Sequence, residues 1–216
     1  VLDEVFPDEY LRSHDLWPLR QALPQIHFPS DQESLDRARR RLVYQELFVL
    51  QLALAVRRQE QHDQQKSPAL EATAKIDARI RRLFPFELTA GQETAIAEIA
   101  ADMAGPRPMN RLLQGDVGSG KTVVAVYAML LAVAHGYQAV LMAPTEVLAR
   151  QHVLTLERML AASQVRRAAL TGGLAPGQRA ALLQQIAAGQ IDLVVGTQAI
   201  IQDDVSFAKL GLVVID

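Results

Sequence analysis

The feature that most constrains the fold is the run of residues 115–122, Gly-Asp-Val-Gly-Ser-Gly-Lys-Thr. It fits the pattern G-x-x-x-x-G-K-[ST], a phosphate-binding loop between a strand and a helix. Its glycines let the backbone turn so that successive N–H groups point at one centre, which suits a triphosphate at a helix N-terminus. A glycine-rich turn that fits by chance is the alternative, but a short apolar stretch precedes the loop and an apolar helix follows it. We therefore predict a nucleoside triphosphate site.

The residues of this loop have separate expected roles. Lys121 is expected to reach the β- and γ-phosphates, and the Thr122 hydroxyl to help bind Mg²⁺. The rest of the loop is expected to line the nucleotide: Gly115, Asp116, Val117, Gly118, Ser119 and Gly120. The loop alone does not distinguish ATP from GTP.

Composition narrows the class of protein. The 216 residues allow one domain and a sizeable appendage, and a net charge of −2 gives no global attraction to nucleic acid. The absence of cysteine excludes disulfides and zinc–thiolate sites, and fits a cytoplasmic protein. The longest apolar run, 123–134, is too short to span a bilayer, so no membrane partner is expected. Val1 in place of methionine indicates that the chain comes from a longer protein.

From residue 111 onward, apolar strands alternate with helices. We predict strands at 111–114, 139–143, 167–170, 193–195 and 212–215, and helices at 120–135, 146–162 and 177–188. This alternation predicts an α/β fold with a parallel sheet covered by helices on both faces. The loops that follow the strands then meet at the carboxyl edge of the sheet: 115–122, 144–146, 171–173, 196–198 and Asp216.

The region before the loop is mainly helical. Ser30 and Glu33 form a capping-box pattern, and no proline or glycine follows until Pro68, which predicts one long helix over 31–64. Shorter helices are expected at 16–23 (ending near Pro24), 71–83 and 92–103, and a glutamine-rich linker at 59–69. We place the domain boundary between a helical segment, 1–82, and a nucleotide-binding domain, 83–216. The arginines at 37, 39–41, 57 and 58 either face DNA or are solvated and ion-paired; consecutive arginines point in different directions around a helix, which favours the second interpretation.

Phe86 and the run Leu88-Thr89-Ala90-Gly91-Gln92 lie upstream of the loop. A glutamine amide can accept from the adenine amino group and donate to the neighbouring ring nitrogen, so Gln92 would favour ATP over GTP. Taken alone, a surface glutamine that opens a helix is the simpler interpretation. These residues resemble the Q motif of superfamily 2 helicases, however, and further motifs follow in the same order.

Residues 143–152, Ala-Pro-Thr-Glu-Val-Leu-Ala-Arg-Gln-His, resemble helicase motif Ia, and Thr171-Gly172-Gly173 resembles the turn that follows it. Residues 196–202 resemble the next DNA-side motif, and 210–216 the strand that leads into motif II. Within the superfamily the chain is most similar to the RecG family of branched-DNA translocases. The phosphate loop is of the RecG form, and Ile26-His27-Phe28-Pro29 before the long helix resembles the segment that joins the RecG wedge domain to its motor.

The resemblance implies an ATP-dependent DNA helicase with a RecA-like fold that reverses stalled forks and migrates Holliday junctions in recombination and repair. ATP and Mg²⁺ would be held by Lys121, Thr122 and Asp216, with Phe86 and Gln92 near the base. The implied contacts to the DNA backbone come from loop residues at the sheet edge: Pro144, Thr145, Arg150, Gly172, Gly173, Thr197 and Gln198. The implied partners are branched DNA and the wedge and second motor domains of the same polypeptide.

The chain departs from the family pattern at Gln198, where many relatives have histidine, and at Gly173, where serine is common. The motif II glutamate would follow Asp216, so residues 1–216 alone are expected to bind nucleotide and to hydrolyse it negligibly. Alternative functions are a transcription-coupled repair or replication-restart helicase, and a nucleotide-binding module without turnover. Thr145 also suits a helix N-cap, and Gly172-Gly173 also suits a simple turn.

Overall fold

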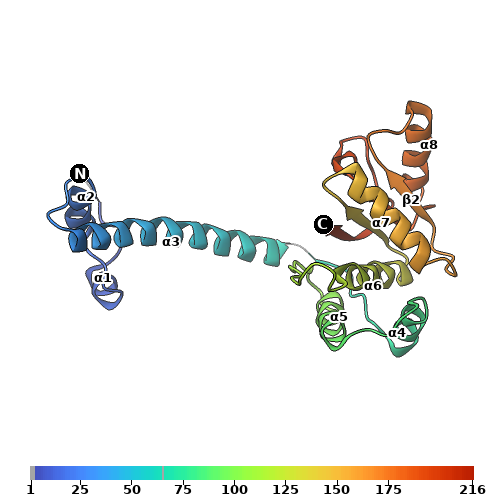
Figure 1. Ribbon diagram of the computed structural model, residues 1–216, viewed down its shortest axis with the longest axis horizontal. Helices are drawn as coiled ribbons and strands as arrows, with labels where there is room; N and C mark the ends of the chain where they lie inside the picture. The colour runs from blue at the N-terminus through green and yellow to red at the C-terminus, as the bar shows by residue number, and fades with distance from the viewer. Residues whose placement is uncertain (1–2, 65) are drawn as a thin grey trace. The chain divides into compact units, whose positions relative to one another are not determined.

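A computed structural model describes residues 3–64 and 66–216, which form two compact units, one up to Gln64 and one from Gln65 onward (Figure 1). The first unit contains α1 (Asp8–Ser13), α2 (Leu19–His27) and α3 (Gln32–Gln64). The helices of the second unit are α4 (Ala74–Arg81), α5 (Ala90–Met103), α6 (Lys121–Ala134), α7 (Glu146–Met159), α8 (Pro176–Ala187) and the 3₁₀ helix η1 (Gln198–Ile201). Its strands are β1 (Gln138–Met142), β2 (Arg167–Leu170), β3 (Leu193–Gly196) and β4 (Leu210–Ile215).

The long helix α3 agrees with the predicted span 31–64, but its cap differs from the prediction. Asp31 Oδ1 accepts from the Ser34 N–H at 2.7 Å, so Asp31 caps the helix in place of Ser30. The predicted end of a helix near Pro24 is also wrong, because α2 continues through this proline to His27. A proline removes one helical hydrogen bond, and the packing of α2 on α3 keeps the helix together.

Three arginines of α3 form ion pairs within the first unit: Arg37, Arg40 and Arg41. Arg40 Nη1 lies 3.3 Å from Asp15 Oδ2, and Arg41 pairs with Glu4. Arg41 is 0% exposed, and its guanidinium lies 4.8 Å from the ring centroid of Phe6. The ion-paired interpretation is therefore confirmed for these three residues, whereas a solvated position is wrong for Arg41, because the N-terminal segment folds over it. The side chain of Arg58 lies outside the described residues.

The sheet of the second unit has the order β2-β3-β1-β4, and all of its pairs are parallel. Alternate residues of a strand point to opposite faces. Leu141 packs in a cluster with the buried residues of α6 and α7, whereas Val140 packs in a second cluster with Ile186 of α8 and Ile200 of η1. Both faces are thus covered, which confirms the predicted parallel α/β fold.

The predicted strand at 111–114 is wrong in this structure, where these residues form no regular element. Arg111 instead turns toward α5, where it pairs with Glu98 and with Asp102, its Nε lying 2.7 Å from Asp102 Oδ2. These ion pairs hold the segment against a helix, and β4 remains an edge strand of the sheet. The apolar pattern of Leu112 and Leu113 could not reveal this competition.

The compact units divide after Gln64, whereas the predicted domain boundary lies after residue 82. Residues 66–82 group with the second unit because α4 packs on α6, the helix that follows the phosphate loop. Thr73 caps α4, its side chain accepting from the Ile76 N–H. Across the described residues, none of the helices combines the length and apolarity that a membrane crossing needs.

Candidate functional site at the carboxyl edge of the sheet

The four strands bring their following loops to one edge. β1 ends at Met142, β2 at Leu170, β3 at Gly196 and β4 at Ile215, and the register pairs Met142 with both Gly196 and Ile215. The loops that begin at residues 143, 171 and 197, together with Asp216, therefore lie at the same edge. This confirms the predicted arrangement for the loops that follow the four observed strands.

The phosphate loop has the backbone that its glycines predict. Gly118 and Gly120 have φ angles of 83° and 80°, in the left-handed region that favours glycine. A Cβ placed at Gly115 would lie 2.7 Å from Ser119 Oγ, so the loop is also tightly closed on itself. Gly120 stands at the N-cap of α6, and no side chain caps this helix. The free N–H groups of the first turn are therefore available to an anion, which fits the phosphates of a nucleotide.

Lys121 folds back over this loop. Its Nζ donates to the carbonyl oxygens of Gly115 at 2.8 Å and of Asp116 at 2.9 Å. An ammonium has three N–H donors, so one remains for a phosphate oxygen without breaking either contact. Within the described part of the chain the Thr122 hydroxyl makes no hydrogen bond, and the Val117 side chain is fully exposed. Among the described residues, Lys121 and Thr122 thus keep a free N–H and a free hydroxyl, and their binding of a phosphate and its metal stays a prediction.

Gln92 connects the Q-motif residues to the loop. Its Oε1 accepts from the Thr89 N–H at 2.9 Å and completes a capping box, and its Nε2 donates to the Ser119 carbonyl at 2.9 Å. A Cβ on Gly120 would overlap this Nε2, so a larger residue there would displace the amide in addition to straining φ. Gln92 therefore opens a helix and also contacts the phosphate loop. One amide N–H and one lone pair remain for an adenine edge.

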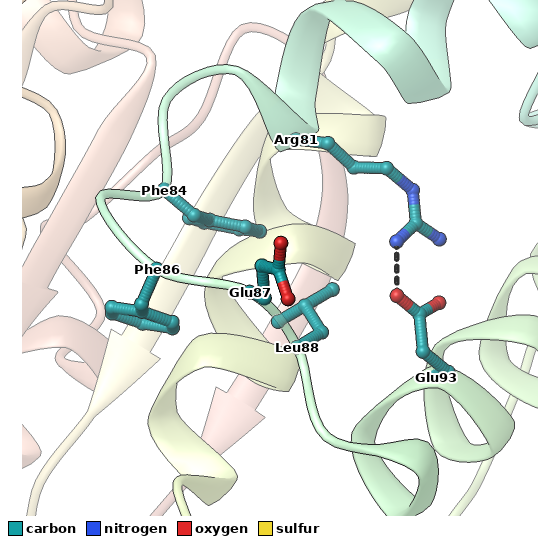
Figure 2. Close-up of a pocket in the computed structure, with 6 residues that line it drawn as sticks. All are labelled: Arg81, Phe84, Phe86, Glu87, Leu88 and Glu93. Atoms are coloured by element: carbon teal, nitrogen blue, oxygen red, sulfur yellow. Dashed lines mark hydrogen bonds and ion pairs between the residues drawn. The ribbon is translucent and has the colours of Figure 1, made fainter.

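A pocket of about 380 Å³ lies between the end of α4 and the start of α5 (Figure 2). Its lining comes from α4, the connecting loop and α5: Arg81, Phe84, Phe86, Glu87, Leu88 and Glu93. The Phe84 and Phe86 rings stack with centroids 6.3 Å apart and planes 7° apart, and Phe86 is half-exposed. A flat aromatic ring at the mouth of such a pocket could stack on a purine base.

A partly buried polar network joins the helices around this pocket. Arg81 lies 2.5 Å from Glu93 of α5 and 2.7 Å from Asp77, and the Tyr127 hydroxyl of α6 donates to Asp77 at 2.6 Å. Burial tends to raise the pKa of Asp77, but hydrogen bonds from Tyr127 and Arg81 bring it below its ordinary value. Burial, together with the hydrogen bond to Asp77, raises the pKa of Tyr127. Sequence reasoning missed this network, because no short-range pattern links residues on three helices.

Asp216 lies at the end of β4, where its N–H continues the ladder by donating to the Met142 carbonyl at 2.9 Å. Its carboxylate oxygen Oδ2 lies 2.9 Å from His152 Nε2 of α7. Among the residues that the structure describes, no group of three or more His, Cys, Asp or Glu side chains could hold a metal. Mg²⁺ is usually bound by one or two carboxylates together with substrate phosphates. Asp216 and Thr122 fit that requirement, with nucleotide supplying most of the ligands.

The expected DNA-side residues are accessible at this edge. Thr145 caps α7, accepting from the Leu148 N–H at 3.3 Å, so its capping role is confirmed. The carboxylate of Glu146 lies over the turn that contains Gly172, and its Oε1 would be 3.4 Å from a Cβ placed at Gly172. The other expected residues are exposed or half-buried: Pro144, Arg150, Gly173, Thr197 and Gln198. The structure brings these residues to one edge, and their contact with DNA stays a prediction.

One further contact at this edge was missed. Arg179 of α8 binds Asp204 at 2.8 Å and Gln202 at 2.7 Å, and so holds the segment after η1. An arginine 25 positions before an aspartate is no recognisable sequence signal, so only the fold could reveal the pair.

Comparison with known proteins places this geometry in a family. The sequence model of DEAD/DEAH box helicases matches residues 89–216. The chain is 46% identical over 215 residues to the ATP-dependent DNA helicase RecG of Synechocystis sp., with 100% of this chain and 26% of the relative covered. It is 42% identical over 215 residues to RecG of Bacillus subtilis, covering 100% of this chain and 32% of that relative.

The fold is also similar to a solved structure. The chain matches RecG bound to a three-way DNA junction with a TM-score of 0.83 and 40% identity, over 99% of this chain and 29% of that one. The chain thus spans about a third or less of its relatives' length. Because the family's sequence model covers more than half of the residues, the chain belongs to the DEAD/DEAH box helicases.

Proposed function

We propose that the chain carries one ATP-binding half-site of an ATP-dependent DNA helicase of the RecG type that acts on branched DNA. The observation that carries this proposal is the extent of the similarity. It covers the helical residues before position 89 as well as the motor, and the solved relative is bound to a three-way junction. The wedge and second motor domains of the same polypeptide are part of the proposal, as is a cytoplasmic location.

On the nucleotide side, the backbone N–H groups of the loop would bind the phosphates, and Lys121 would donate its third N–H to the terminal phosphate. Thr122 and Asp216 would hold Mg²⁺, which supplies neutralisation of charge on the phosphate oxygens. The adenine would meet Gln92 and the exposed ring of Phe86. Because Gln92 also contacts the Ser119 carbonyl, base recognition and loop closure would be joined through one side chain.

On the DNA side, the edge offers hydroxyls, exposed backbone and the cation of Arg150. Groups of this kind hold backbone phosphates and do not read base sequence. Glu146 is an acid at the same edge, so phosphate would approach the turn at Gly172 only from the side away from this carboxylate. These features fit a motor that moves along DNA of any sequence.

The test is ATP turnover by the full-length protein on forked duplex, plain duplex and single strands, with Lys121→Ala as the control. We expect the strongest stimulation by forks and loss of turnover in the control. Equal stimulation by plain duplex would remove the branched-DNA assignment and favour a repair or restart helicase. Turnover that survives in Lys121→Ala would show that this loop is not the catalytic site.

A further inference from the structure

The contact between His152 and Asp216 joins two motifs that are 64 residues apart in the sequence. A carboxylate only accepts hydrogen bonds, so His152 Nε2 carries the proton and donates to Asp216 Oδ2 at 2.9 Å. The His152 side chain is 13% exposed, whereas that of Asp216 is 49% exposed. The donor is therefore held within the fold, and the acceptor faces the open edge of the sheet.

The surroundings of His152 explain why it is fixed. Ala149 and Leu156 lie three residues before and four after it, on the same face of α7, and both are buried. This face packs on β2 and β3. The imidazole therefore projects from a helix face that is anchored on the sheet.

Asp216 has little else to orient it. Its backbone is fixed by the hydrogen bond to Met142, but a backbone bond does not select a side-chain rotamer. Over residues 3–64 and 66–216, His152 is the single side chain that forms a hydrogen bond with the Asp216 carboxylate. Without that contact the carboxylate would sample several rotamers, and part of any metal-binding free energy would be lost in ordering it.

We propose that His152 is a positioning residue that holds Asp216 in the orientation required for Mg²⁺. The proposal rests on the proposed function, which assigns the metal to Asp216. The imidazole N–H occupies one carboxylate oxygen and leaves the other for the metal or its water. Hydrogen-bond partners of metal-binding carboxylates typically affect metal affinity by about 10–100-fold. Because Thr145, which caps α7, is one of the expected DNA-side residues, the same contact would join that helix to the metal site.

Two amide substitutions separate this role from simple packing. In His152→Gln the side-chain nitrogen falls near the position of the imidazole Nε2, so the donor is kept. In His152→Asn the nitrogen falls near Nδ1 and cannot reach Asp216. Both variants are polar and similar in size, so they form a matched pair. The affinity of the full-length protein for a fluorescent ADP analogue is measured with Mg²⁺ and with EDTA, and folding is checked by thermal unfolding.

We expect Mg²⁺ to tighten nucleotide binding in the wild type, and this tightening to fall by about tenfold in His152→Asn. His152→Gln should restore it, and affinity in EDTA should be the same in all three proteins. In an Asp216→Asn background, His152→Asn should have no further effect, because the contact that it removes is already changed. Equal loss in EDTA, failure of His152→Gln to restore the effect, or full additivity with Asp216→Asn would overturn the proposal.

The Lys121→Ala variant distinguishes failure of this inference from failure of the proposed function. If Lys121→Ala binds nucleotide as well as the wild type, both are overturned. If binding depends on Lys121 but His152→Asn keeps the full effect of Mg²⁺, this inference alone is overturned.

Discussion

Gly118 and Gly120 provide a matched pair for testing how the phosphate loop is held. Both have φ near 80°, so an alanine at either position carries a similar backbone penalty of about 1–2 kcal/mol. They differ in the space around them. A Cβ at Gly118 meets nothing within 4 Å, whereas a Cβ at Gly120 overlaps the Nε2 of Gln92. Gly120→Ala must therefore displace that amide and lose its hydrogen bond to the Ser119 carbonyl.

A hydrogen bond of this kind contributes about 1 kcal/mol. We therefore expect Gly120→Ala to lower the free energy of unfolding by about 1 kcal/mol more than Gly118→Ala does. For a unit of this size that difference corresponds to about 2–4 °C in the thermal midpoint. Thermal unfolding followed by circular dichroism measures it. Fluorescent nucleotide binding with Gly120→Ala should also weaken more, because Gln92 no longer contacts the loop.

The Gln92→Ala background supplies the control. Gln92→Ala removes the amide that a methyl group at position 120 would meet. In that background the two glycine substitutions should lower the free energy of unfolding by the same amount. An equal cost of Gly118→Ala and Gly120→Ala in the wild-type background would contradict the argument. A difference that persists without the Gln92 side chain would also contradict it.

Two further predictions concern the rest of the unit. A Cβ at Gly196 would overlap the Leu170 carbonyl of the paired strand, so Gly196→Ala should destabilise by about 3 kcal/mol in urea unfolding, at the upper end of overpacking costs. A Cβ at Gly177 of α8 meets nothing within 4 Å, so Gly177→Ala should cost nothing and should stabilise the helix by up to about 1 kcal/mol. Similar midpoints for these two variants would show that β2 and β3 can separate freely. The pKa of Asp77 is lowered on folding, so its stabilisation of the fold is fully present above the unfolded pKa of about 3.9 and is lost as the pH falls from there through the lower folded pKa. Urea midpoints should therefore drop more steeply below about pH 4 in the wild type than in Asp77→Asn, and parallel curves would contradict this assignment.

Sequence and structure contributed differently to the candidate site. The motif spacing alone predicted the phosphate loop, since a glycine pattern followed by Lys-Thr and an apolar helix is a local signal. It left Gln92 between adenine recognition and the opening of a helix. The structure confirms that Gln92 opens α5, with its Oε1 accepting from the Thr89 N–H, and adds a contact from its Nε2 to the Ser119 carbonyl. Adenine recognition stays a prediction. Only the tertiary structure could reveal the contact with the loop, because Gln92 and Ser119 are 27 positions apart.

Ion pairs account for two of the differences between the sequence predictions and the structure. Arg111 pairs with Glu98 and Asp102 of α5 instead of belonging to a strand. Arg41 is buried and pairs with Glu4 of the N-terminal segment. In both cases a long-range partner outweighs the local pattern. Local propensity is a weak signal compared with such contacts.

From residue 120 onward the order of strands, helices and glycine turns could be read from the sequence, because the period of apolar residues and the chemistry of glycine act within a few positions. The family resemblance rests on the same short motifs. The tertiary structure alone decided which side chains meet across the fold: His152 with Asp216, and Tyr127 with Asp77. These contacts depend on how helices pack on the sheet, and that packing is set by the burial of the whole apolar core rather than by any local run of residues.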